Sequence, residues 1–411
     1  MLHIKILILM NILFITQVYP DEKGTKTIRG SSVCHYWTKE WVKMGHQVYV
    51  IYLYPQYLSV LHKIAEFCPN YIAQFTNGTL TKKLNHSIFY ELDGVHIYKI
   101  PMYKPIPKIR YGKDVINGIV DEIKDHLLKC RIKPDIILSH FDNPVLEIAS
   151  LCKSFLHIPF AFVLHGYPSD IRRLYPHNYE ELINNVDLWG FRSVSIKKDF
   201  ESQYGNLSKS FIAYSGIPEY YIPKGDFVLE KEKGKVCYVG ALIKRKYPEK
   251  VLEAMIPFMQ KGEMSLTYIG EGALEKRIRN QAQKNKIGSR LYLLGQVDRE
   301  HVQHELASTD IFVMVSRHET FGMVYLEAMA HGCITIASKN EGFDGIIVDG
   351  VNGFLCEAGN SNELRRIIEF INEMDADKKQ SIRQAAISTA QAMTEHKMAV
   401  AYINDVCNLI K

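Results

Sequence analysis

The 411-residue sequence lacks several features that would assign it to a particular class of protein. We find no apolar run long enough to cross a bilayer, so any membrane contact is expected to be peripheral. The eight cysteines are scattered and form no C-x-x-C pair, which argues against a zinc site and for a reducing cytosol. The formal net charge is only +5, which is too small for a protein whose principal partner is nucleic acid.

The apolar stretch at residues 1–18 suggests either a secretion signal or a buried strand. The polar residues Asn11, Thr16 and Gln17 interrupt it, and no small-x-small cleavage site follows. We therefore interpret residues 11–19 as the first strand of the fold. A cytoplasmic protein is expected, and the inner face of the membrane remains an alternative location.

The bulk composition, 47% apolar and 23% charged, is that of a globular protein, and the length predicts two α/β domains. Through residue 223 there are 25 Lys+Arg against 20 Asp+Glu, and from residue 224 onward 25 against 25. The first part could thus favour an anionic membrane surface or acceptor. Its basic, aromatic segment Tyr103–Lys113 could bind lipid or carbohydrate, but we favour a solvated, proline-rich loop.

The most informative stretch runs from Ser316 to Gly332, between two apolar runs that resemble strands. A strand, a polar loop, a helix and a second strand form a βαβ unit, which places its site at the carboxyl ends of its strands. Glu319 lies in the loop and Glu327 in the first turns of the helix. Two acids beside a helix start that can bind phosphate suit a ligand that is anionic and rich in hydroxyls, such as a sugar nucleotide. The residues that offer free N–H groups there are Phe321, Gly322 and Met323.

Two other loops follow strand-like runs in the second half of the chain. Gly240 and the basic residues that follow, Arg245 and Lys246 among them, form a cationic loop ahead of a helix. Such a loop could hold a diphosphate, and a solvated basic turn is the alternative. Gly270 ends another strand and would let backbone approach a nucleotide, although a lone G-x-G is a weak signal.

Three residues of the first half are candidates for a ligand site. Gly30 precedes an expected helix and can simply start it, and the alternative, a glycine that faces the donor phosphates and the acceptor, is implied only by the family resemblance described below. His165 follows an apolar strand, which places it to meet a ligand, although a structural histidine is the alternative. Asp170 either orients His165 or caps the next helix.

The spacing of Glu319 and Glu327 resembles the E-x7-E motif of retaining GT-B glycosyltransferases, specifically family 4, the glycosyl transferases group 1. The likeness continues through residues 341–355 and covers most of the chain, more closely in its second half. It implies an α/β GT-B fold, in which two doubly wound Rossmann-like domains face each other across a cleft. The expected parts are an acceptor-side domain at 1–218, a linker at 219–234, a donor-binding domain at 235–394, and a terminal helix at 395–411 that crosses back to the first domain.

The resemblance also implies roles for residues at matching positions. Glu319 would contact the donor sugar, Glu327 the ribose hydroxyls, and His165 the sugar or the reaction centre. Lys246 matches a lysine of the family that serves the diphosphate. Ala241 stands where the family usually has an arginine, and Arg245 could supply the missing charge.

The implied function is a metal-independent, retaining glycosyltransferase of the hexosyltransferase type that needs no cofactor. It would move a sugar from a nucleotide-diphosphate donor, a UDP-sugar above others, to a hydroxyl of a carbohydrate or lipid-linked acceptor, in bacterial cell-surface polysaccharide or glycoconjugate synthesis. The Asp375-Ala376-Asp377 triplet precedes an expected helix, so we interpret Asp375 as its N-cap, not as a metal ligand. Two alternatives remain: a sugar-nucleotide epimerase or hydrolase with the same fold, and a non-catalytic partner subunit that binds the donor.

Overall fold

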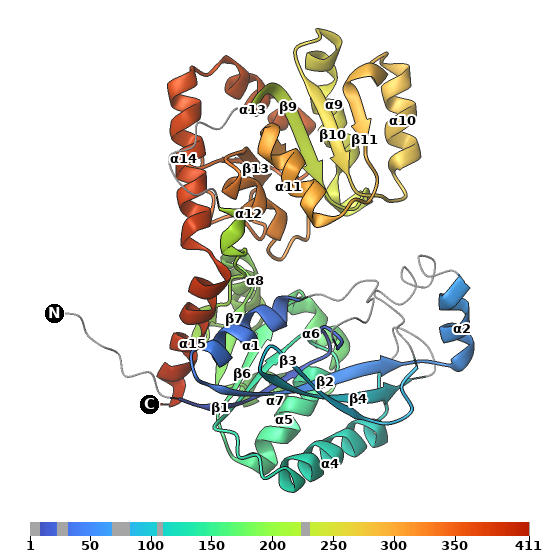
Figure 1. Cartoon of the computed structure of the whole chain (residues 1–411), viewed down its shortest axis with the longest axis vertical. Helices are drawn as coiled ribbons and strands as arrows, with labels where there is room; N and C mark the ends of the chain where they lie inside the picture. The colour runs from blue at the N-terminus through green and yellow to red at the C-terminus, as the bar shows by residue number, and fades with distance from the viewer. Residues whose placement is uncertain (1–8, 23–31, 68–82, 105–109, 223–230, 411) are drawn as a thin grey trace, which may run out of the picture. The chain divides into compact units, whose positions relative to one another are not determined.

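The computed structural model describes residues 9–22, 32–67, 83–104, 110–222 and 231–410, which form two compact units. Unit 1 contains the described residues up to Phe191, together with Asp199–Ala213 and the chain from Met398 onward. Unit 2 contains Arg192–Lys198 and Tyr214–Lys397. Each unit is a sheet with helices on both faces (Figure 1), so the predicted pair of α/β units is confirmed.

Unit 1 has an eight-stranded sheet in the order β3-β4-β2-β1-β5-β6-β7-β8, in which only the β3–β4 pair is antiparallel. Since helices cover both faces, the central strands are buried on both sides and read as apolar runs. The strands are β1 (Asn11–Thr16), β2 (Gln47–Gln56), β3 (Ile88–Leu92), β4 (Val95–Tyr103), β5 (Ile136–His140), β6 (Phe160–Leu164), β7 (Leu188–Phe191) and β8 (Ser210–Ile212).

The helices of this first part pack in two layers. Helix α1 and the C-terminal helix α15 cover one face of the sheet, and α4 and α5 cover the other (Figure 1). The helices are α1 (Val33–Lys43), α2 (Ser59–Phe67), α4 (Lys113–Lys129), α5 (Val145–Leu156), α6 (Pro168–Leu174), α7 (Tyr179–Asn185), α8 (Val194–Tyr204) and α15 (Glu395–Ile410).

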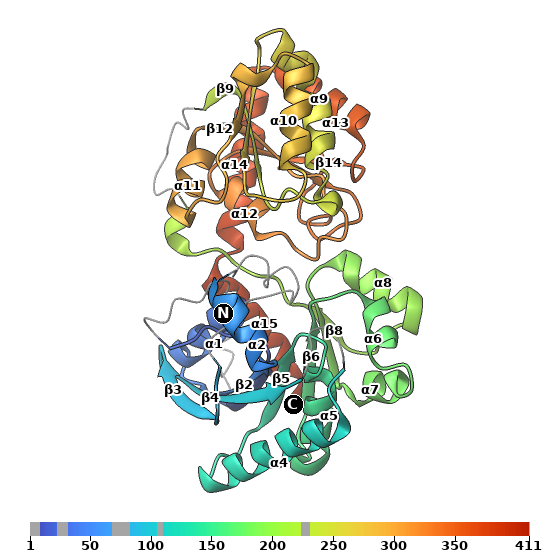
Figure 2. The same ribbon diagram turned by 90° about the vertical axis from the view of Figure 1, so that its right-hand side faces the viewer.

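Unit 2 has a six-stranded parallel sheet in the order β11-β10-β9-β12-β13-β14. Helices α9, α10 and α13 form one covering layer, and α11, α12 and α14 form the other (Figure 2). The strands are β9 (Glu232–Val239), β10 (Ser265–Ile269), β11 (Leu291–Leu293), β12 (Thr309–Val313), β13 (Ile334–Ser338) and β14 (Phe354–Cys356). The helices are α9 (Pro248–Gln260), α10 (Glu275–Lys284), α11 (Arg299–Ser308), α12 (Met323–Ala330), α13 (Ser361–Glu373) and α14 (Ala376–Ala392), with short 3₁₀ turns η1 (Glu219–Tyr221), η2 (Lys244–Lys246) and η3 (Gly288–Arg290).

Two element boundaries differ from the sequence-based expectations. The first strand ends at Thr16, not at residue 19, because the Thr16 hydroxyl accepts a hydrogen bond from the Val18 N–H and turns the chain. Strand β9 begins at Glu232, inside the segment predicted as a linker, because its first residues already pair with β12. Polar, charged residues at the start of β9 explain why this part of the strand resembled a linker.

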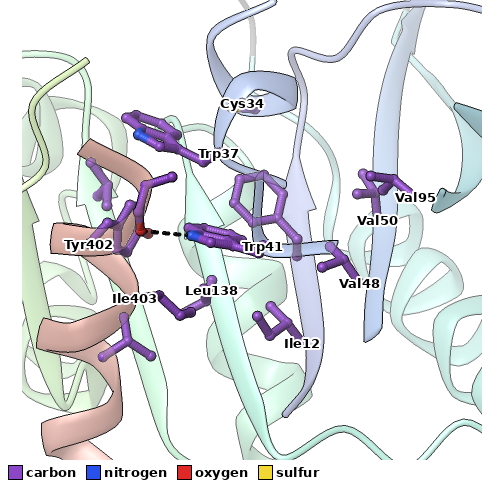
Figure 3. Close-up of a cluster of buried hydrophobic side chains, with 14 of the residues drawn as sticks. Ile12, Cys34, Trp37, Trp41, Val48, Val50, Val95, Leu138, Tyr402 and Ile403 are labelled. Carbon is purple, nitrogen blue, oxygen red and sulfur yellow. Dashed lines mark hydrogen bonds between the residues drawn. The ribbon is translucent and has the colours of Figure 1, made fainter. Parts of the chain in front are cut away.

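Helix α15 belongs to unit 1 from Met398 onward. One face of it is buried in the unit 1 core, at positions spaced by three and four residues. These positions are Ala399, Tyr402, Ile403 and Val406. The indole N–H of Trp41, on α1, donates to the carbonyl of Ala399 at 3.0 Å, and the Tyr402 ring packs edge-on against Trp41 (Figure 3). The end of the chain is thereby built into the core of its first domain.

Most of the described cysteines behave as small hydrophobic residues. All seven that fall in the described ranges are free thiols, and all but Cys130 are buried. Burial raises the pKa of Cys152, for example, to about 12. Among the helices that the structure describes, none is long and apolar enough to cross a membrane.

The three tryptophans lie in unit 1, so tryptophan fluorescence reports on the unfolding of that unit. Trp41 is fully buried, and Trp41→Ala should lower the free energy of unfolding by about 3–5 kcal/mol, since it leaves a large cavity. Urea denaturation followed by the remaining two tryptophans would measure this. Leu128→Ala is the control, because Leu128 is 67% exposed and its loss should change little. A similar effect of both substitutions would contradict the role given to Trp41.

Candidate active site

The first group of candidate residues lies at the carboxyl ends of β9 and β12. These two strands are neighbours at the centre of the unit 2 sheet, and the strand order runs outward from them in opposite directions. Ligands of open α/β sheets bind where the order reverses in this way. Gly240 directly follows β9, and the loop with Glu319 follows β12.

Glu319 meets the cationic loop at this point. Its Oε2 lies 3.1 Å from Lys246 Nζ and 3.7 Å from Arg245 Nη1, and the Glu319 side chain is only 13% exposed. Oε2 is enclosed, yet it accepts no hydrogen bond of acceptable geometry from any described residue. A buried carboxylate oxygen is thus held by charge alone and retains its capacity to accept a hydrogen bond from a hydroxyl.

Backbone contacts hold the two loops together. Arg245 Nη1 donates to the His318 carbonyl at 3.1 Å, and the Arg317 N–H donates to the Arg245 carbonyl at 2.7 Å. The loop after β10 approaches equally closely, since a Cβ on Gly270 would lie 2.3 Å from the Gly240 carbonyl oxygen. Gly270 therefore has a packing reason to be glycine, and it brings backbone to the ends of three adjacent strands.

Glu341 holds the Glu319 loop through hydrogen bonds, a role that was not assigned to it from the sequence. Its carboxylate accepts a hydrogen bond from the Glu319 N–H at 2.8 Å, and the Gly342 N–H donates to the Glu319 carbonyl at 2.8 Å. Burial raises the pKa of Glu341, while the N–H groups of Glu319 and His318 oppose that shift. Glu341 lay in the stretch that extended the family resemblance, but nothing in its local sequence indicated this contact.

Helix α12 begins at Met323, where the motif predicted a helix start. Gly322 precedes it with φ +86°, a conformation that favours glycine, and a Cβ there would lie 2.5 Å from Tyr325 Cε2. Phe321 is buried, under the guanidinium of Arg192 at 5.2 Å. The first N–H groups of α12 are therefore next to the Glu319 loop, as a phosphate site requires.

Glu327 lies farther along α12 and is 7% exposed. Its Oε1 accepts a hydrogen bond from Arg299 Nη2 at 2.9 Å, and the Arg299 guanidinium also lies 5.2 Å from the centre of the Tyr221 ring. Sequence reasoning missed Arg299. In the sequence it is a basic residue that follows a short loop, and nothing near it indicated a contact with Glu327.

The second group of candidates lies in unit 1, at the carboxyl ends of β5 and β6. His165 directly follows β6, and its Nε2 lies 2.8 Å from Nδ1 of His140, the last residue of β5. Its ring stacks on Phe141 at 4.0 Å. Asp170 lies in the first turn of α6 and binds Arg173, with Nη2 at 2.8 Å. Gly30 lies outside the described residues.

Asp142 was not predicted, yet it has an unusual carboxyl group. Oδ1 is enclosed and accepts no hydrogen bond from any described residue. Burial, with a smaller contribution from nearby Asp170, raises the pKa of Asp142 to about 7 against the opposing effect of Arg173. A Cβ on Gly166 would lie 2.5 Å from Asp142 Oδ2 and 3.4 Å from Asp170 Oδ2, so the two carboxyls are close neighbours. In the sequence, Asp142 resembled an ordinary turn residue before Asn143-Pro144.

The aspartate triplet near the C-terminus has the predicted capping role. The Asp375 side chain accepts a hydrogen bond from the Lys378 N–H at 2.7 Å and is the N-cap of α14. Among the described residues, no cluster of three or more His, Cys, Asp or Glu side chains could hold a metal ion.

Known proteins resemble this chain over most of its length. The family described as glycosyl transferases group 1 matches residues 224–389. An uncharacterized glycosyltransferase of Methanocaldococcus jannaschii is 30% identical over 304 residues, which cover 70% of this chain and 78% of that protein.

Two solved structures show the fold. Sucrose-phosphate synthase from Thermosynechococcus elongatus has a TM-score of 0.67 at 15% identity, over 97% of this chain and 99% of that one. HepE of Anabaena, in complex with UDP-glucose, has a TM-score of 0.65 at 16% identity, over 97% of this chain and 100% of that one. The predicted GT-B class of fold, with two parallel-sheet α/β units, is confirmed by this likeness.

The pKa of Asp142 predicts a pH dependence of stability. Because its pKa rises on folding from 3.8 to about 7, its contribution to stability is complete below the unfolded value and is lost as the pH rises through the folded value. Between pH 5 and pH 8 the wild type should lose about 2–3 kcal/mol relative to Asp142→Asn. Urea denaturation followed by tryptophan fluorescence measures this difference. Asp121→Asn, at an exposed position on α4, is the control, and its stability should change with pH as that of the wild type does. If the stability of Asp142→Asn also changed with pH as the wild type does, the raised pKa of Asp142 would be wrong.

Proposed function

The chain belongs to the glycosyl transferases group 1, and we propose that it transfers a sugar, with retention of configuration, from a nucleotide-diphosphate sugar to a hydroxyl group of an acceptor. The observation that carries this proposal is the environment of Glu319. One buried carboxylate oxygen is held beside Lys246 and Arg245 but keeps its capacity to accept a hydrogen bond. Such a group suits a sugar hydroxyl or the positive charge that develops on a sugar ring as its leaving group departs.

The departing diphosphate would be stabilised by fixed positive charge on the same side of unit 2. Lys246 supplies an ammonium group, Arg245 a guanidinium 45% exposed, and the start of α12 supplies backbone N–H groups. Ala241 leaves the position of the family's usual arginine without charge, and we assign its task to Arg245. With these groups in place, we propose that the reaction needs no metal ion.

The nucleoside would be held by Glu327 through the ribose hydroxyls. The Glu327 carboxylate is already oriented by Arg299, and Tyr221 lies beside Arg299, so the ribose would meet a pre-organised group. UDP is the nucleotide that we favour, since the HepE structure of Anabaena holds UDP-glucose. The glucosyl group itself is not implied by this likeness, and a hexose is the proposed class of sugar.

The acceptor would be bound by unit 1. Asp142, Asp170 and His165 gather at the carboxyl ends of β5 and β6, where two carboxyls and an imidazole can bind hydroxyl groups. We propose a carbohydrate or lipid-linked acceptor in the synthesis of cell-surface polysaccharide or glycoconjugate. A lipid-linked acceptor would bring the enzyme to a membrane surface.

Substitution of the two motif glutamates should separate binding from turnover. Glu327→Gln should weaken UDP binding by about ten- to hundredfold, because it removes a charged ribose contact. Glu319→Gln should leave UDP affinity nearly unchanged and lower UDP-sugar turnover by about a hundredfold, because its contact matters most in the transition state. Calorimetry with UDP and release of UDP from a panel of UDP-sugars would measure the two effects.

Glu300→Gln is a matched control, since Glu300 is an exposed residue of α11 next to Arg299. Equal losses of UDP affinity in both motif variants would contradict the division of roles. Release of UDP without any glycosylated product, across a range of acceptors, would instead favour a hydrolase.

Lys246→Ala should cost more affinity for UDP than for UMP or uridine, because a point charge acts most strongly where phosphate charge is greatest. Arg245→Ala, made in parallel, tests the assignment of the missing arginine, and the exposed Lys244→Ala is the control. Turnover should persist in EDTA. Strict dependence on magnesium or manganese would overturn the metal-free proposal, and unchanged UDP affinity in both variants would place the diphosphate elsewhere.

A further inference from the structure

His140 is a fully buried imidazole at the end of β5, the strand next to β1 at the centre of the unit 1 sheet. Aromatic rings surround it: Phe14 of β1 stacks on it at 4.8 Å, and Trp37 of α1 lies at 4.9 Å. Tightly packed side chains keep one rotamer, so the direction of both ring nitrogens is set by this packing. None of the roles described above requires a histidine at this position.

Both nitrogens of His140 make hydrogen bonds, and the two partners come from distant parts of the chain. Nδ1 lies 2.8 Å from His165 Nε2, and Nε2 lies 2.9 Å from the Tyr402 hydroxyl of α15. Tyr402 is itself fixed, since its ring packs edge-on against Trp37 and Trp41 (Figure 3). A continuous path of hydrogen bonds therefore runs from the C-terminal helix through His140 to His165.

The chemistry of the three groups gives this path a direction. A neutral imidazole has one N–H donor and one acceptor nitrogen, and burial disfavours a charged ring. A phenol O–H is a good donor and an imidazole nitrogen is a better acceptor than a phenol oxygen, so Tyr402 donates to His140 Nε2. The proton of His140 is then on Nδ1 and is donated to His165 Nε2. With Nε2 as an acceptor, His165 carries its own proton on Nδ1.

We propose that His140 is a positioning residue that holds His165 in the Nδ1–H tautomer, and that Tyr402 sets this state through the His140 ring. His165 then has its N–H at Nδ1, and its Nε2, occupied as an acceptor, does not act as a base. The tautomer follows from unit 1 alone. Its effect on turnover rests on the role proposed above for His165, as a group that binds a hydroxyl of the acceptor.

The hydrogen bond from Tyr402 gives the burial of α15 in unit 1 a chemical reason. Residues of α15 that only fill the core could be any apolar side chain of suitable size, but the Tyr402 hydroxyl has a specific donor role. Tyr402→Phe removes only that hydroxyl and keeps the ring. Tyr90→Phe is the matched control, because it removes a tyrosine hydroxyl of the same core, which donates to the Pro20 carbonyl at 2.7 Å, and leaves both partners of His140 and the rings that pack against Tyr402 in place.

The direct test is nitrogen NMR of the full-length protein with ¹⁵N-labelled histidine and no ligand, in which His165 is assigned by comparison with His165→Ala. In the wild type, one-bond proton coupling should appear at His165 Nδ1 and not at Nε2. Tyr402→Phe should shift the His165 signals toward a mixture of tautomers, and Tyr90→Phe should not. A proton on His165 Nε2 in the wild type, or His165 signals unaffected by Tyr402→Phe, would overturn the proposal.

A double-mutant cycle tests the catalytic consequence. Tyr402→Phe should lower kcat for UDP-sugar consumption by about three- to tenfold with KM unchanged, which is the effect of one hydrogen bond. In the His165→Ala background the same change should have no further effect, whereas any effect of Tyr90→Phe should be additive. If the spectra are as expected but the effect of Tyr402→Phe on kcat persists in the His165→Ala background, the tautomer is supported and the proposed role of His165 is refuted. Failure of the tautomer and failure of the proposed role are therefore distinguishable.

Discussion

The contact between Glu319 and Lys246 depends on one constraint, the parallel pairing of β9 with β12. Because parallel strands end at the same edge of a sheet, the loops that follow them must meet there. Glu319 and Lys246 are 73 residues apart and become neighbours for this reason. Gly270, after β10, extends the arrangement to a third strand, since only a residue without Cβ lets the backbones approach so closely. The other contacts described for unit 2 hold side chains and backbone in place at this edge of the sheet.

Both units place their candidate residues at the carboxyl ends of parallel strands, but the charges of the groups gathered there differ. In unit 2, opposite charges meet at the strand ends, and each buried carboxylate has a cation beside it: Glu319 has Lys246, and Glu327 has Arg299. In unit 1, the strand ends carry Asp142, whose pKa is raised by burial and by nearby Asp170, and a neighbouring pair of imidazoles. Cationic surroundings suit an anionic donor, and a carboxyl with a pKa near 7, such as Asp142, can donate as well as accept a hydrogen bond with a hydroxyl of an uncharged acceptor. The division of substrates proposed here follows from this difference.

The local elements of the candidate site were predictable where the pattern lies in a short motif. The E-x7-E spacing, the helix start at Met323 and the capping role of Asp375 follow from residues close together in the sequence, and the structure has the local elements that they predicted. Residues whose role depends on a distant partner were missed. Asp142 resembled a turn residue, Glu341 lay in a motif without an assigned contact, and Arg299 only followed a loop. Each of these residues is distinguished by its burial and by its interaction partner, and both depend on tertiary packing.

The sequence by itself determined the two α/β units, because alternating apolar strands and amphipathic helices can bury their apolar faces in few other ways. It also determined that Glu319 and Glu327 lie one loop and one helix turn apart. Only the tertiary structure decided which charges face them, where β9 begins, and that Tyr402, 262 residues from His140, reaches the same buried ring. The physical reason is that hydrogen bonds and ion pairs act over a few ångströms in space, and distance along the chain carries almost no information about them.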